Sequence, residues 1–181
     1  MTPGRLLKLL FVLAAAYFSQ PLLVLSGVTF QAADGNLPLG MLLNATLIFH
    51  EAGHWILSPL GQFLMVCGGS IMQLLVPLVC LIAFWRKEEK FGAGFSLYWL
   101  GVSGINLSYY ISDARAQQLE LISRDTLHDW HFILDRMNLL NSDVAIGHGV
   151  YFASLVIGIV GLGVMAWGAL DKDNETPIPW E

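Results

Sequence analysis

Five long apolar runs dominate this sequence and limit what it can fold into. They cover residues 6–28, 38–60, 62–85, 91–112 and 145–169. About 20 apolar residues are enough for a helix to cross a bilayer, and each run reaches that length. The composition agrees, because 55% of the residues are hydrophobic, only 13% are charged and the mean hydropathy is +0.61. We therefore predict an all-α integral membrane protein with five transmembrane helices.

The polar parts of the sequence complete this outline. Residues 1–170 are expected to form a single membrane domain, and an acidic flexible tail follows at 171–181. Residues 128–134 carry apolar side chains at helical spacing within the longest polar segment, which predicts an interfacial helix between the fourth and fifth spans. The net charge of −5, without a basic cluster, argues against nucleic acid as a partner. The lipid bilayer is the partner that the composition predicts.

One polar motif lies inside the second apolar run. His50, Glu51 and His54 form an H-E-x-x-H pattern in Phe49–Trp55. On a helix, residues four apart share a face, so the two imidazoles can bind one metal ion. The carboxylate of Glu51 is then placed to take a proton from a metal-bound water. Ionisable residues are costly at membrane depth, and binding of a metal accounts for three of them within five positions.

The five-span order places most of the chemically versatile side chains on one side of the membrane. The second and fourth spans run parallel, so the ends of both, the start of the third and the 117–143 segment meet at that side. The side chains expected there are His50, Glu51, His54, Asp113, His128, His131 and His148. Hydrophobicity alone does not require this grouping, which therefore predicts a functional site.

These motifs resemble those of the site-2-protease family of intramembrane zinc metallopeptidases, in particular a small bacterial branch. Residues 106–115 lie two spans after HEAGH and are similar to the family's Asn-Leu…Asp-Gly signature, although Ala114 replaces the glycine, the proline is missing and the spacing is one residue shorter. Residues 69–73 resemble its Gly-Pro-x-x-Asn element. The resemblance, over residues 38–116, implies Zn²⁺ held by His50, His54 and Asp113.

The same resemblance implies a function and a location. The protein would hydrolyse peptide bonds of transmembrane substrates, with Glu51 as the general base, in a multi-pass position in the bacterial inner membrane. The substrate helix would have to unwind locally, and residues 68–70 are candidates for an exposed edge that receives it. Partner subunits are the other protein partners to consider.

Several alternatives stay open at this level. His128 and His131 can replace or supplement Asp113 as metal ligands, and another divalent ion can replace zinc. Asp113 and Asp129 can instead orient the imidazoles from a second layer. The departures from the family signature also favour an alternative function, that of a non-proteolytic metal-binding membrane subunit with a structural or assembly role in a larger complex.

Overall fold

The computed structural model describes residues 1–23, 36–119 and 128–171, and within them it contains helices and no strands. The α-helices are α1 (Pro3–Phe18), α2 (Leu37–Leu57), α3 (Gln62–Arg86), α4 (Lys90–Ser112), α5 (Asp129–Arg136) and α6 (Asp143–Leu170). Three short 3₁₀ turns join them: η1 (Gln20–Leu23), η2 (Ser58–Leu60) and η3 (Leu140–Ser142). The predicted all-α class is confirmed.

Local signals in the sequence account for where the long helices begin. The Asn36 side chain accepts a hydrogen bond from Leu39 N (3.2 Å) at the start of α2, and Pro38 occupies its first turn. Gly61, with φ of 96°, turns the chain from η2 into α3. Glu89 caps α4 by accepting a hydrogen bond from Gly92 N (2.6 Å). These boundaries leave α2, α3 and α4 as consecutive antiparallel helices.

The first predicted span differs from the structure. A single helix was expected over residues 6–28, but α1 ends at Phe18 and gives way to η1, which contains Pro21. A proline disfavours the helical conformation of the residue before it and lacks the N–H that the helix needs. Residues 24–28 of that prediction lie outside the described residues, as do positions 172–181 of the predicted acidic tail.

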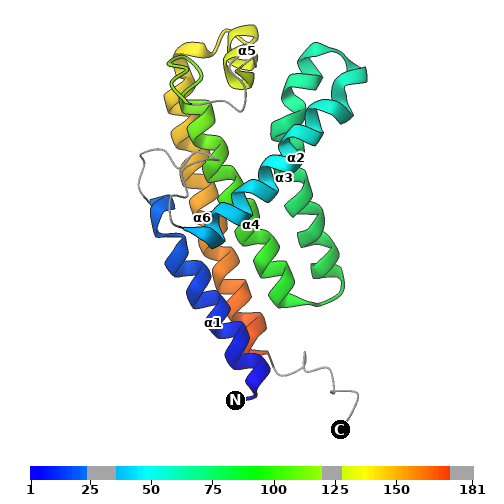
Figure 1. Cartoon of the computed structure of the whole chain (residues 1–181), viewed down its shortest axis with the longest axis vertical. Coiled ribbons are helices and arrows are strands. Elements are labelled where there is room, and N and C mark those ends of the chain that lie inside the picture. Colours follow the sequence, from blue (N-terminus) through cyan, green and yellow to red (C-terminus); the bar gives the residue numbers. More distant parts are fainter. Residues whose placement is uncertain (24–35, 120–127, 172–181) are drawn as a thin grey trace.

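Two helix pairs set the shape of the molecule (Figure 1). Helices α4 and α6 have the most extensive contact, with α1 packed along α6, and α2 and α3 form a hairpin that contacts α4 through α3. Helix α5 lies at the end of the molecule where α4 ends and α6 begins. The C-terminal end of α2 reaches the same end, so the HEAGH segment and α5 come from distant parts of the sequence to one region.

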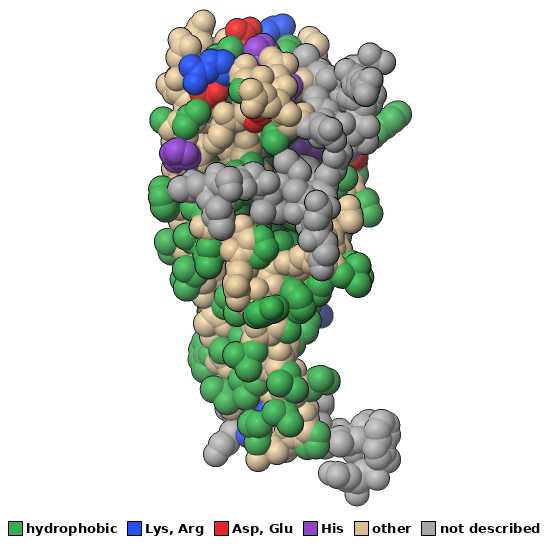
Figure 2. Space-filling view, turned by 60° about the vertical axis from the view of Figure 1, so that its left-hand side comes forward, with side chains coloured by type: hydrophobic (Ala, Val, Ile, Leu, Met, Phe, Trp, Pro, Cys, Tyr) green, Lys and Arg blue, Asp and Glu red, His purple; other side chains and the backbone are tan. Residues whose placement is uncertain are grey.

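Two of these helical stretches are long and apolar enough to cross a membrane by length and composition: Gln62–Arg86 and Leu140–Leu170. Only 33% and 28% of their most apolar windows are buried within the protein. Figure 2 shows a body covered largely by hydrophobic side chains, with charged residues and histidines gathered mainly toward the end that carries α5. The five-span topology remains a prediction.

Candidate metal centre

The His50 and His54 side chains lie next to each other on α2, as their spacing predicts. Their ring centroids are 5.0 Å apart. His50 is buried, His54 is partly buried and Glu51 is exposed beside them. One ligand atom from each of these three residues lies within 4.8 Å of the other two, so the group can hold a metal ion.

The backbone of α3 forms the floor under the imidazoles. A Cβ at Gly69 would stand 2.5 Å from His50 Nε2 and 2.6 Å from His54 Nε2. One turn away, a Cβ at Gly53 would stand 2.1 Å from Gly68 O, so the two helices touch through their backbones. The glycines at 68 and 69 are needed because the helices approach each other this closely.

Residues 68–70 therefore do not provide the exposed edge that was expected. Gly68, Gly69 and Ser70 are all buried between the helices. Their small size serves the packing of α2 on α3 and leaves space for the imidazoles. A substrate strand cannot pair with this part of the backbone, because every N–H and C=O there belongs to the helix interior.

The tautomer of each imidazole follows from its Nδ1 partner. His54 Nδ1 lies 2.9 Å from the backbone oxygen of Met65, which only accepts, so His54 carries its proton on Nδ1. His50 Nδ1 lies 2.9 Å from Gln73 Oε1. The Gln73 amide is fixed because its Nε2 donates to Ser103 O (2.9 Å), so Oε1 faces His50 and accepts from it. Both Nε2 atoms are thereby left with lone pairs.

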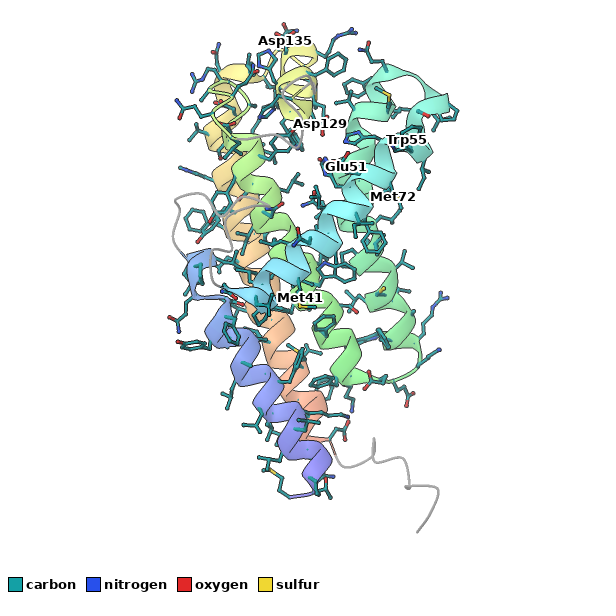
Figure 3. All side chains as sticks on the ribbon, in the orientation of Figure 1. Met41, Glu51, Trp55, Met72, Asp129 and Asp135 are labelled. Atoms are coloured by element: carbon teal, nitrogen blue, oxygen red, sulfur yellow. The ribbon has the colours of Figure 1, made fainter. Side chains whose placement is uncertain are left out.

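A third acceptor stands in front of these two lone pairs. Asp129 Oδ2, at the start of α5, lies 3.1 Å from His50 Nε2 and 3.2 Å from His54 Nε2. Figure 3 shows Asp129 on α5 across from Glu51 on α2. Two imidazole lone pairs and a carboxylate oxygen repel one another unless a cation, either a proton or a metal ion, lies between them. This donor set is able to hold a metal ion.

Burial and hydrogen bonding act on Asp129 in opposite directions. Burial raises the pKa of its carboxyl, but the hydrogen bonds with His50 and His54 outweigh burial and leave the pKa below its usual range. The carboxylate is 7% exposed as a residue and is kept ionised by the imidazoles that it faces. A divalent cation placed between the carboxylate and the two rings would take over the role of the protons that these hydrogen bonds require.

Asp113, the third ligand suggested by the family resemblance, lies in a neighbouring cluster. Its Oδ1 accepts a hydrogen bond from Gln118 N (2.9 Å), and its Oδ2 accepts one from Leu119 N (3.0 Å). Oδ2 is also 3.4 Å from His128 Nε2. Arg115, two residues after Asp113, pairs with Asp143, and its Nη2 lies 3.2 Å from Asp143 Oδ1.

The other predicted histidines hold the segments around α5. His128 caps α5, with Nδ1 accepting from His131 N (3.1 Å). His131 Nδ1 lies 2.8 Å from Ala114 O, the carbonyl of a residue after α4. His148 is exposed in the second turn of α6. The structure thus gathers His50, Glu51, His54 and Asp129, and it gives His128 and His131 contacts with the end of α4.

Two residues, Gln73 and Asp129, have larger roles in the site than the sequence indicates. Gln73 occupies the amide position of the element that resembles Gly-Pro-x-x-Asn, and it orients His50; the position within that element was the available signal. The sequence suggests for Asp129 only the role of orienting imidazoles from a second layer. Nothing in its spacing from HEAGH, 79 positions after His50, indicates that it reaches both rings.

No protein-family model, curated protein or solved structure matches the chain. The class that fold and site define is thus an all-helical protein with two stretches long enough to cross a membrane and a His-Glu-His group able to hold a metal ion.

Proposed function

We propose that this chain is a membrane-embedded zinc metallopeptidase of the site-2-protease kind. The observation that carries the proposal is the convergence of two fixed Nε2 lone pairs, from His50 and His54, beside the exposed carboxylate of Glu51. Histidines that hold Zn²⁺ with an open position and a neighbouring carboxylate are typical of hydrolases. A bound Zn²⁺ would supply a Lewis acid for the carbonyl and acidify water.

The residues of the chain have distinct tasks in this reaction. His50 and His54 would hold the ion, and their Nδ1 partners keep the rings in place. Glu51 takes a proton from the attacking water and returns it to the leaving amine nitrogen, so that the peptide bond is replaced by a carboxylic acid and an amine. Since Glu51 is exposed, a substrate can approach it without displacing a helix.

The surface around Glu51 favours an apolar substrate. Ile48 and Trp55 lie three positions before and four positions after Glu51, on the same face of α2, and are 68% and 81% exposed. A carboxylate on a largely apolar, exposed helix face suits a transmembrane segment that arrives from the lipid and has locally unwound, because a helical peptide bond is shielded by its own backbone.

Membrane embedding is part of the same proposal. The two long apolar stretches expose most of their surface, whereas the core helix of a water-soluble protein would be largely buried. Helices α2 and α4 occupy two more of the predicted spans, and α1 begins the remaining one. We propose a multi-pass protein of the bacterial inner membrane with the site near one surface.

The test compares new protein termini in membranes that contain the wild type or Glu51→Gln. The metallopeptidase predicts termini inside apolar segments that appear with the wild type and vanish with Glu51→Gln, while zinc content stays the same. Identical termini in both membranes would exclude Glu51 as the base. Zinc in both proteins without any new termini would favour the alternative, a metal-binding subunit with a structural or assembly role.

A further inference from the structure

The placement of α5 bears on a question that the proposed function leaves open, namely how the metal site is completed. His50 and His54 supply two ligands, and a catalytic zinc site in proteins usually has three. Asp129 is the residue whose side chain reaches both Nε2 atoms, at 3.1 and 3.2 Å from the same oxygen, Oδ2. It belongs to α5, the next α-helix after α4 in the described part of the chain.

The distances resemble the edges of a coordination polyhedron. Ligand atoms around a tetrahedral zinc ion, with bonds of about 2.0–2.2 Å, stand about 3.3–3.6 Å apart. The two distances from Asp129 Oδ2 are close to these edges. Gln73 and Met65 hold the protons on Nδ1, so a hydrogen bond from either Nε2 to Asp129 requires a doubly protonated ring, and a bound metal ion would take the place of that second proton.

From this geometry we infer that Asp129 is the third protein ligand of the metal ion, and that α5 is the element that closes the site. The inference rests on the proposed function for the presence of the metal, and it departs from the family signature, which points to Asp113. Histidine and carboxylate ligands together suit Zn²⁺, with one position left open for water or substrate.

Helices α3 and α4 hold Asp129 in position. Its backbone N donates to the Tyr110 hydroxyl on α4 (3.0 Å). Its neighbour Trp130 donates from Nε1 to Ser70 Oγ on α3 (3.1 Å). On the other side of α5, Leu134 is 2% exposed and packs in a core cluster with Ile111 and other residues of α4. The carboxylate is thus positioned by packing and hydrogen bonds that do not depend on the metal.

Asp113 acts on the same element through His128, which makes it a positioning residue. Because His128 Nδ1 accepts from His131 N, the proton of the neutral ring is on Nε2, which lies 3.4 Å from Asp113 Oδ2. The ring of His128 lies 4.3 Å from that of Tyr110, centroid to centroid. His128 is also the N-cap of α5, so Asp113 lies against the residue immediately before Asp129.

The experiment measures Zn²⁺ affinity by competition with a chromophoric chelator on the full-length protein in detergent. Asp129→Asn keeps the size of the side chain and the backbone bond to Tyr110 but removes the charge; we expect its affinity to fall more than 100-fold. Asp129→Glu keeps a carboxylate and should recover part of that loss. Asp113→Asn should lose about tenfold, as outer residues of metal sites do. Asp135→Asn, an exposed carboxylate on the same helix (Figure 3), serves as the control and should bind as the wild type does.

The outcomes separate this inference from the proposed function. Wild-type affinity in Asp129→Asn overturns the inference, and a loss confined to Asp113→Asn assigns the ligand to Asp113; in both cases the peptidase proposal stands. A wild type that binds no Zn²⁺ overturns the proposed function itself. If Asp129→Asn fails to fold, Asp129→Glu decides: an affinity below that of the wild type supports the ligand role, because the longer side chain displaces the carboxylate, and an affinity equal to that of the wild type contradicts it.

Discussion

Gly69 of α3 faces the imidazole of His50 so closely that no side chain fits between them. A Cβ at this position would stand 2.5 Å from His50 Nε2 and 2.6 Å from His54 Nε2. Both contacts involve Nε2 atoms, which are the atoms that would bind the proposed metal ion. The smallest possible enlargement of position 69 therefore competes directly with the metal, and not merely with the packing of two helices.

Gly69→Ala should consequently abolish metal binding while leaving the helices in place. The added methyl group displaces both rings, and we expect Zn²⁺ affinity to fall at least 100-fold in the chelator competition. The matched control is Gly163→Ala on α6, where a Cβ meets nothing within 4 Å. Alanine is the better helix former by about 1 kcal/mol, so the control should be as stable as the wild type or more so. Unchanged affinity in Gly69→Ala would contradict the placement of the site.

Gln73 offers a test of how the imidazoles are oriented. Gln73→Leu removes the acceptor for His50 Nδ1–H, and the ring is then free to turn or to change tautomer. We expect Zn²⁺ affinity to drop about 10- to 100-fold, the usual effect of losing a partner of a metal-binding histidine. Gln62→Leu, an exposed glutamine at the start of the same helix, is the control and should bind normally. Equal affinities in the two variants would show that Gln73 does not orient the ring.

Much of the helical outline could be predicted from the sequence, since it depends on local signals. The helices predicted at 62–85 and 91–112 are found at Gln62–Arg86 and Lys90–Ser112. A charged turn between Arg86 and Lys90 separates the two helices, because such a run of charges does not fit within an apolar helix. The prediction of one continuous helix over residues 6–28 was wrong, since α1 ends at Phe18. The high average hydrophobicity of this run hides the effect of Pro21, which favours an early end of the helix.

The candidate site could be predicted only where it is local. A spacing of four places His50 and His54 on one helix face whatever the rest of the chain does. Asp129 reaches them because α5 docks on α3 and α4 through Trp130 and Leu134, and such a docking has no periodicity in the sequence. The roles of Gly69 and Gln73 likewise depend on how closely α3 approaches α2, and no local sequence motif indicates this approach.

Asp143 should be important for the frame that carries α5. Its carboxylate is 1% exposed and accepts from Arg115 N (3.2 Å) and Val144 N (2.8 Å), with Arg115 Nη2 also 3.2 Å away. Asp143→Ala leaves these donors unpaired, and we expect a loss of about 2–3 kcal/mol in the free energy of unfolding. Thermal unfolding in detergent measures it, with the exposed Asp135→Ala as control. A melting temperature equal to that of the control would show that the junction of α4 and α6 does not depend on this carboxylate.

A single substitution on the surface of α6 can distinguish a membrane protein from a water-soluble helical bundle. Val156 is 61% exposed within the long apolar stretch Leu140–Leu170. If that stretch lies in lipid, Val156→Lys places a charge near the bilayer centre, at a cost of about 2.5–3.5 kcal/mol. We expect the fraction of the protein that remains in membranes after an alkaline wash, and the yield of folded protein, to fall. If the stretch faces water, the same lysine is an ordinary surface residue with an effect within about 0.5 kcal/mol.

Met137→Lys, 52% exposed in the turn after α5, is the matched control, because it lies outside the apolar stretches and should be tolerated in either case. Equal recovery of the two variants would therefore contradict the membrane position of α6.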